Sequence, residues 1–133
     1  MSRCSASLAA IIIAIAALMA APSFGANQAP PGESCVFSHA WWGWRSPAPN
    51  VILLRVNVDD VYRLDLKKGS KLLSYPDVYL INRQQSSDWL CSPDDFDLLL
   101  KEGNGMFSEP LFVKKITKLT PAEIAAIPPK DRP

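Results

Sequence analysis

The chain contains a single histidine, His39, which limits the acid–base and metal chemistry that it can support. General bases and activated nucleophiles need a partner group that orients them. No serine of this chain stands in the G-x-S-x-G pattern that marks one kind of nucleophile. These shortages predict a protein that is not an enzyme, with no catalytic residue and no cofactor.

The chain also lacks a surplus of charge of either sign. Its 14 Lys and Arg residues oppose 13 Asp and Glu residues. Proteins that bind nucleic acid without sequence preference need a basic surplus, so we expect no nucleic-acid partner. Apolar residues make up 48% and charged residues 20% of the 133 positions, which is typical of one small globular domain and not of a disordered chain.

One long uncharged run stands near the N-terminus. Arg3 precedes fourteen consecutive apolar residues at positions 8–21, and Pro22 ends the run. As a helix, this run would span about 21 Å, which is less than the roughly 30 Å hydrocarbon core of a membrane. The pattern therefore favours a signal peptide, and an uncleaved membrane anchor is the alternative.

The residues after the run indicate where cleavage occurs. Ser23 and Gly25 supply the small side chains that signal peptidase needs. We expect residues 1–25 to be a signal peptide that is cut after Gly25, with Ala26 as the alternative site. The mature protein would then be periplasmic or secreted, with no stable membrane insertion.

Cleavage would leave two cysteines, Cys35 and Cys91. An even pair in an exported chain is typical of a disulfide, and two unpaired thiols are the alternative. In the chain-entropy model, a disulfide that closes a loop of this length stabilises the folded state by about 4 kcal/mol. Two cysteines and His39 do not complete a tetrahedral metal site, so we expect no bound metal.

Short runs of β-branched, aromatic and aliphatic residues predict a mainly β fold. The expected strands are residues 51–58, 61–66, 78–81, 88–91, 96–100 and 111–117. Thr120, with Pro121 and Glu123 behind it, predicts the capping box of a short C-terminal helix. The predicted fold is a small antiparallel sheet curled into a barrel or sandwich, with about six strands.

Proline placement suggests the domain limits. Residues 26–34 should form an extended leader, residues 35–127 a single β-rich domain, and residues 128–133 a flexible tail. Residues 46–50 contain two prolines, which donate no ladder hydrogen bond, and are predicted to be a loop.

The first two strands should form a hairpin whose register follows from the pattern of its faces. A two-residue turn at Asp59 and Asp60 would mix charge into both faces. Placing Arg55 opposite Asp65 gathers the apolar residues on one face and centres the loop on Asp60. The second register is our prediction.

Residues 41–45 (WWGWR) have the most unusual local composition in the chain. Trp and Arg are enriched at binding hot spots, although a small domain also needs tryptophans in its core. Strand alternation points Trp42 and Trp44 inward and Trp41 outward. Trp41, Arg45 and His39 are therefore the candidate binding residues, and an ordinary surface role is the alternative for His39.

An acidic cluster at Asp94, Asp95 and Asp97 could suggest a calcium site or a carboxylate pair. Calcium loops usually contain a glycine turn and end on a bidentate glutamate, and both are missing here. We therefore interpret the cluster as solvated surface charge.

The chain resembles a family of small exported bacterial proteins called domain of unknown function 6491. The resemblance covers about residues 35–127 and is carried by Gly43 and Trp44 after Cys35, and by the segments VILLRVNV, YRLDL, SSDWLC and VKKITKLTPAEI. It implies export, a strand-rich fold and the disulfide, but supplies no catalytic residue. Many members have cysteines where this chain has Ser70 and Leu111, which implies a second disulfide that is absent here as a unit.

The function that we expect is that of a non-catalytic periplasmic or secreted binding module. Its partner would be an envelope protein or a cell-wall component. The alternative is a small inhibitor of an envelope enzyme, for example a lytic hydrolase. An inhibitor would present a rigid protruding loop, for which residues 82–87 are the candidate.

Overall fold

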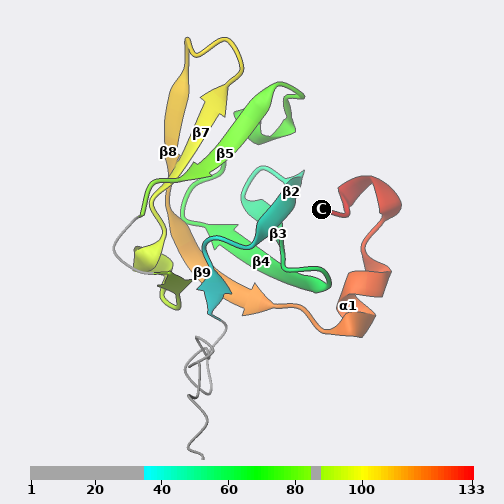
Figure 1. The fold of residues 1–133 in the computed structure, drawn as a ribbon. Helices are drawn as coiled ribbons and strands as arrows, with labels where there is room; N and C mark the ends of the chain where they lie inside the picture. The colour runs from blue at the N-terminus through cyan, green and yellow to red at the C-terminus, as the bar shows by residue number, and fades with distance from the viewer. Residues whose placement is uncertain (1–34, 85–87) are drawn as a thin grey trace, which may run out of the picture.

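The computed structural model describes residues 35–84 and 88–133, so the expected signal peptide and leader lie outside the described residues (Figure 1). In the described part, nine strands form three antiparallel sheets, and one short α-helix follows them. The mainly β fold with a short C-terminal helix is therefore confirmed. The described strands do not close into a barrel, and the architecture is sandwich-like.

The largest sheet has the order β2-β3-β4-β9, with β2 (Trp41–Ala48), β3 (Val51–Val56), β4 (Asp60–Leu66) and β9 (Val113–Lys118). The second sheet has the order β5-β7-β8, with β5 (Val78–Asn82), β7 (Leu98–Glu102) and β8 (Ser108–Leu111). A small third sheet pairs β1 (Val36–Phe37) with β6 (Trp89–Leu90). The helices are α1 (Pro121–Ala126) and the 3-10 turns η1 (Lys71–Ser74), η2 (Pro93–Asp95) and η3 (Pro129–Asp131).

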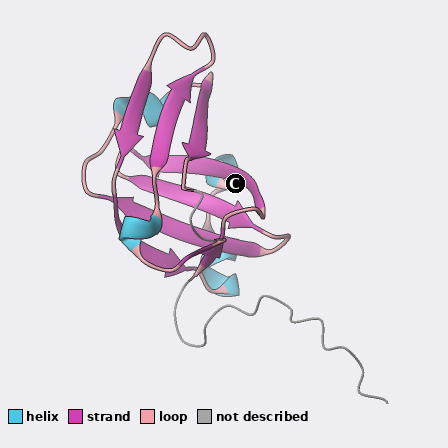
Figure 2. Cartoon of the chain, turned by 60° about the vertical axis from the view of Figure 1, so that its left-hand side comes forward, coloured by secondary structure: helices cyan, strands magenta, loops and turns pink. Residues whose placement is uncertain are grey.

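The chain passes from the second sheet to the largest sheet between β8 and β9. We expected one strand over residues 111–117, but Phe112 separates two strands that belong to different sheets. The carbonyl of Phe112 accepts a hydrogen bond from the Lys67 amide at 2.8 Å. The strands of the two sheets run at a steep angle to each other (Figure 2). Among the described strands, β2 and β9 are the edge strands of the largest sheet, and β5 and β8 are those of the second sheet.

The main core lies between the two larger sheets, and a smaller cluster lies on the outer face of the β2-β3-β4-β9 sheet. The smaller cluster joins Val51, Leu53 and Val61 to Ile127, just beyond α1. Strand β3 is consequently buried on both faces, which explains its continuous apolar sequence. The fully buried side chains of the main core include Val36, Ile52, Leu54, Val56, Leu64, Leu90, Leu98, Leu100 and Val113.

The predicted register of the β3–β4 hairpin is wrong. Arg55 lies opposite Val61, not opposite Asp65, and Val51 takes the place opposite Asp65. The shift is an even number of residues, so Leu54 still faces the core as predicted. Face patterning alone cannot distinguish registers that differ by an even shift, because side chains alternate with a period of two.

Turn geometry decides the register instead. Strand β3 ends at Val56, which pairs with Asp60, so the loop contains residues 57–59 and is centred on Val58. Asn57 has a φ of 55°, in the left-handed region that asparagine tolerates better than most residues. The Asn57 amide donates to the Ala40 carbonyl at 2.8 Å, which fixes the loop against the start of β2.

Residues 46–50, which we predicted to be a loop, are partly strand. Strand β2 continues through Pro47 to Ala48, with a register shift between Arg45 and Ala48. Because β2 is an edge strand, the missing Pro47 amide need not cost a ladder hydrogen bond.

Residues 128–133, expected as a flexible tail, contain η3, which lies against β2 (Figure 1). The Arg132 guanidinium donates to the carbonyls of Ile127 at 2.9 Å and Ala125 at 3.0 Å. These bonds satisfy carbonyls at the C-terminal end of α1 that have no intrahelical donor. Arg132, which follows η3, therefore links the C-terminal segment back to the end of α1.

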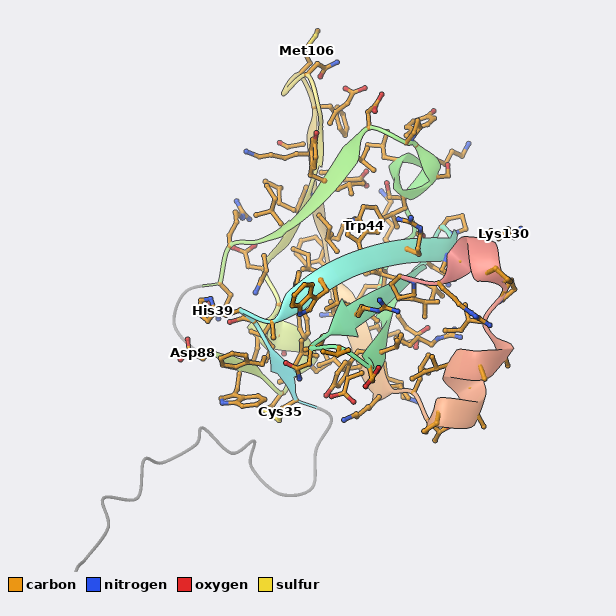
Figure 3. All side chains as sticks on the ribbon, turned by 45° about the vertical axis from the view of Figure 1, so that its right-hand side comes forward. Cys35, His39, Trp44, Asp88, Met106 and Lys130 are labelled. Carbon is orange, nitrogen blue, oxygen red and sulfur yellow. A yellow bond between two sulfur atoms is a disulfide. The ribbon has the colours of Figure 1, made fainter. Side chains whose placement is uncertain are left out.

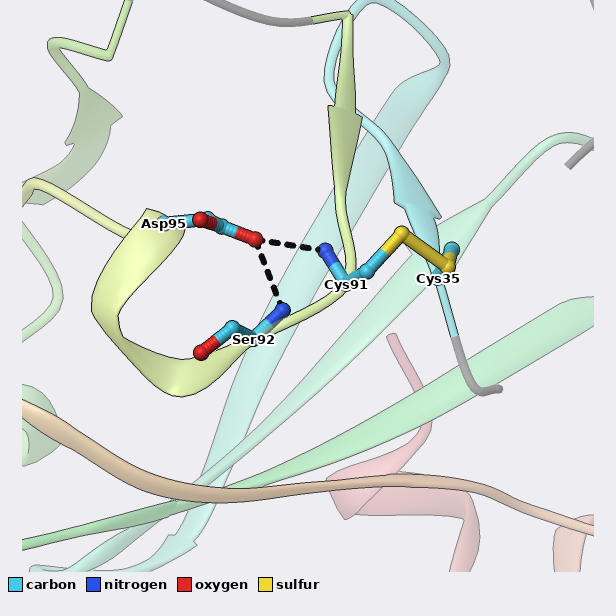
Figure 4. The surroundings of a disulfide bond; sticks show 4 residues. All are labelled: Cys35, Cys91, Ser92 and Asp95. Carbon is cyan, nitrogen blue, oxygen red and sulfur yellow. Dashed lines mark hydrogen bonds between the residues drawn. A yellow bond between two sulfur atoms is a disulfide. The ribbon is translucent and has the colours of Figure 1, made fainter. Parts of the chain in front are cut away.

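The predicted disulfide and helix cap are both confirmed. Cys35 and Cys91 are bonded, with Cα atoms 4.0 Å apart, and their bond links β1 to the end of β6 (Figure 4). The Asp95 carboxylate accepts hydrogen bonds from the amides of Cys91 at 2.9 Å and Ser92 at 2.7 Å. Thr120 caps α1 in the expected capping box.

Replacing both cysteines, as Cys35→Ser with Cys91→Ser, should lower the free energy of unfolding by up to about 4 kcal/mol, because the unfolded chain regains the freedom of the closed loop. Urea denaturation of the oxidised protein and the variant measures this difference. Asp94→Ala, an exposed change beside the same turn, is the control and should have little effect. A loss below about 1 kcal/mol from the double replacement would contradict the prediction.

The left-handed backbone at Asn57 yields a second prediction. Asn57→Ala should destabilise the protein by about 1–2 kcal/mol, because a β-carbon without a local hydrogen bond is disfavoured in that region. Asn57→Gly should cost little, since glycine adopts positive φ freely. Urea denaturation compares the two variants, with Val58→Ala in the same loop as the control. Equal stabilities of Asn57→Ala and Asn57→Gly would rule out the left-handed conformation.

Candidate edge groove

The three candidate binding residues do not lie together. His39 Nε2 is 3.0 Å from Asp88 Oδ1, with both side chains exposed at the disulfide end of the molecule (Figure 3). Arg45 lies in the second half of β2, and Trp41 packs against the main core. The three candidate residues therefore do not form one common surface.

The predicted orientation of two tryptophans is wrong. Trp42 is 73% exposed, whereas Trp41 packs against the main core together with Trp44. The Trp41 indole Nε1 is buried, and no described residue gives it a hydrogen-bond partner. The register shifts between Trp41 and Gly43, which is a β-bulge. A bulge re-aims the side chains of its strand, so the simple alternation fails at Gly43.

A groove of about 510 Å³ lies between β2, η3 and the segment that connects η1 to β5. We call it the edge groove, because edge strands β2 and β5 both contribute to its lining. Figure 3 shows Trp44 above β2 and Lys130 at the C-terminal segment beside it. The lining consists of Trp44, Arg45 and Ser46 from β2, Leu73, Ser74, Tyr75 and Pro76 before β5, Val78 from β5, and Lys130 and Asp131 from η3.

The edge groove combines aromatic surface with positive charge. Trp44 and Tyr75 contribute rings, and Arg45 and Lys130 contribute two cations against the single carboxylate of Asp131. No described residue forms an ion pair with these three charged groups, and the Arg45 guanidinium donates only to the Trp44 carbonyl, at 3.1 Å. Such a surface can hold a ligand that carries apolar groups and a carboxylate.

The two serines of the edge groove are used by the backbone. Ser46 Oγ donates to the carbonyls of Ala48 at 2.7 Å and Val51 at 2.9 Å. Ser74 Oγ donates to the Lys71 carbonyl at 2.8 Å. The lining contains no histidine that could activate either hydroxyl. Both hydroxyls therefore stabilise the backbone around the edge groove.

Among the residues that the structure describes, Tyr62, Lys118 and Glu123 have shifted pKa values, and all three lie outside the edge groove. Burial raises the pKa of Tyr62, and the neighbouring Lys118 partly offsets this shift. The hydrogen bond to Asp60 raises the pKa of Lys118, whose Nζ is 2.8 Å from the carboxylate. Hydrogen bonds from the Thr120 amide and hydroxyl lower the pKa of Glu123. These shifts belong to the strand and helix contacts.

The acidic cluster does not form a shared site. Asp95 caps η2, Asp97 pairs with Arg83 at 2.7 Å, and Asp94 lies 3.6 Å from Lys67. Within residues 35–84 and 88–133, no group of three or more His, Cys, Asp or Glu side chains is placed to hold a metal ion.

None of the helices in the described ranges is long and apolar enough to cross a membrane.

Comparisons with family models, with curated proteins and with solved structures found no match to this chain. The resemblance to domain of unknown function 6491 therefore stays an expectation. Its two cysteine positions, Ser70 and Leu111, are both buried in this chain. Ser70 Oγ donates to the Glu109 carboxylate at 2.7 Å, on the strand that ends at Leu111.

Most of the edge groove could not be found from the sequence. Arg45 is the only candidate binding residue that lines it. Tyr75 stands in a predicted turn, and Lys130 and Asp131 stand in the segment that we expected to be a flexible tail. The missing signal is tertiary, because these residues meet only when the C-terminal segment packs against β2.

The tryptophan positions lead to a stability prediction. Trp41→Ala and Trp44→Ala should each lower the free energy of unfolding by about 3 kcal/mol or slightly less. Truncation of a fully buried aromatic residue typically costs about 3–5 kcal/mol. Trp42→Ala should stay within about 0.5 kcal/mol, since its side chain is exposed. Urea denaturation of the three oxidised variants measures these differences. A larger loss for Trp42→Ala than for Trp41→Ala would contradict the bulge at Gly43.

Proposed function

We propose that this chain is an exported, non-catalytic binding module that holds an extended, carboxylate-bearing segment of an envelope protein in the edge groove. The observation that carries the proposal is the composition of this groove. Two aromatic rings, Trp44 and Tyr75, line it together with Arg45 and Lys130, which have no ion-pair partner among the described residues. Aromatic and arginine side chains contribute most to binding energy at protein interfaces.

Two observations support a periplasmic or secreted location. The apolar run at residues 8–21 has the length and the following small residues of a signal peptide. The Cys35–Cys91 disulfide would persist in an oxidising compartment and would be reduced in the cytosol.

The inhibitor alternative is supported by the base of the loop at residues 82–87, of which residues 85–87 lie outside the described part. The Arg83 guanidinium pairs with the Asp97 carboxylate at 2.7 Å, and the Arg83 amide donates to the Asp97 carbonyl at 2.9 Å. The Asp97 amide in turn donates to Asn82 Oδ1 at 3.1 Å. An inhibitory loop needs such a rigid base.

Capture from an envelope extract tests the proposal. The oxidised protein is immobilised as wild type, as the groove variant Arg45→Ala with Tyr75→Ala, and as the control Arg55→Ala with Trp42→Ala. The control removes the same two kinds of side chain, arginine and aromatic, from another surface. We expect an envelope protein that the wild type and the control retain and that the groove variant retains at least about tenfold less, which corresponds to about 1.4 kcal/mol.

Three results would contradict this proposal. Equal retention by the groove variant would place binding outside the edge groove. Co-sedimentation with purified cell-wall sacculi, without a retained protein, would make a cell-wall component the partner. Inhibition of a lytic hydrolase that Arg83→Ala weakens and the groove variant does not would favour the inhibitor function.

A further inference from the structure

Two of the edge strands in the described part, β2 and β5, are protected very differently. Strand β2 has register shifts on both sides of residues 43–45 and contains Pro47. The C-terminal η3 also packs against it. Bulges, prolines and covering segments are the features that keep an edge strand from pairing with another chain.

As far as the structure describes the chain, strand β5 has neither a bulge nor a proline. It pairs with β7 without a register shift, and its sequence VYLIN contains no charge and no proline. The outward-facing side chains are apolar in character, with Tyr79 61% and Ile81 38% exposed. No strand in the described residues pairs with its outer edge. Unprotected backbone amides and carbonyls on an apolar edge favour the addition of another strand.

We propose that the strand added to β5 is β5 of a second copy of this chain, in antiparallel orientation. The two three-stranded sheets would then form one continuous six-stranded sheet. An antiparallel pair of identical strands has two-fold symmetry, which is the commonest symmetry of protein dimers. The contact is self-complementary, because each copy offers the same edge.

Side-chain chemistry selects the register in which the two-fold axis passes at Leu80. In this register, Tyr79 lies opposite Ile81 of the second copy, which is a favourable pair of an aromatic and a β-branched residue. Asp77 lies opposite Arg83 of the second copy. One pair of opposite charges therefore lies at each end of the paired strands. A shift of two residues in either direction would place Tyr79 opposite Tyr79 or Ile81 opposite Ile81 and would separate these charges.

The two charged residues are available for this contact. The Asp77 side chain is exposed, and no described residue forms an ion pair with it. Arg83 binds Asp97 through one terminal nitrogen and is about half exposed. A guanidinium has five N–H donors in a fixed fork, so it can bind both carboxylates.

Sedimentation equilibrium of the oxidised protein over a wide concentration range tests the dimer. We expect a concentration-dependent equilibrium between monomer and dimer. Ile81→Lys should weaken the dimer at least about tenfold by placing a charge opposite Tyr79 of the second copy. Trp42→Lys, the same kind of change at an exposed position of the other large sheet, should leave the equilibrium unchanged. Circular dichroism checks that both variants are folded.

Cysteine cross-linking tests the register. A mixture of Tyr79→Cys and Ile81→Cys proteins should form an intermolecular disulfide between the two variants, whereas each variant alone should form far less. Cross-linking of Tyr79→Cys alone at the level of the mixture would overturn this register.

Two outcomes would overturn the dimer itself. One is a wild-type protein that stays monomeric at all concentrations. The other is an equal effect of Ile81→Lys and Trp42→Lys on dimerisation. A monomeric wild type whose envelope partner is lost on Ile81→Lys would show that the β5 edge receives a different protein. Capture by the edge groove is measured separately with the Arg45 and Tyr75 variants, so the two proposals can fail independently.

Discussion

Burial of β3 on both faces is the constraint from which the candidate binding surfaces follow. Its inner face supplies Ile52, Leu54 and Val56 to the main core, and its outer face carries Val51 and Leu53. Two large aliphatic side chains on an open sheet face would cost several kcal/mol if they stayed in water. The segment after β9 covers them, with α1 and Ile127 packed on that face. This packing brings residues 128–133 to β2, and the edge groove gains the wall that contains Lys130 and Asp131.

The same packing makes the edges of β2 and β5 unequal. The C-terminal segment packs on the sheet that contains β3 and reaches β2, whereas no described strand pairs with the outer edge of β5. The Trp41–Gly43 bulge adds to the protection of β2 and also turns Trp42 outward. The edge strand that carries the unusual WWGWR sequence is therefore the better protected one. The strand that we propose to pair through its backbone is β5, whose sequence VYLIN contains no residue that by itself indicates a binding site.

The parts of the fold that the sequence predicted depend on local chemistry. The run VILLRV indicates a strand by its composition, Thr120 and Glu123 form a cap within one turn, and an even cysteine pair has one possible partner assignment. The predictions that were wrong concern features that side-chain alternation does not determine or that depend on packing between distant segments. Face alternation allows the predicted register and the observed one equally, because they differ by an even shift, and the left-handed Asn57 stands in the loop of the observed one. A single inserted residue near Gly43 reverses the tryptophan assignment, and the edge groove requires a tail that no local signal places.

Because the two larger sheets do not close into a barrel, other segments must cover the open end of the core. Strands β1 and β6 contain two residues each, too few for a stable sheet of their own, yet Val36 and Leu90 are among the most buried side chains in the described part. The Cys35–Cys91 bond joins the chain at these two strands and keeps the two buried residues together. Reduction of the disulfide would leave only the short β1–β6 pairing to hold Val36 and Leu90 in place. Coverage of this end of the core therefore depends on an oxidising environment. The covalent link therefore holds the β1–β6 end of the domain together without a continuous ring of strands.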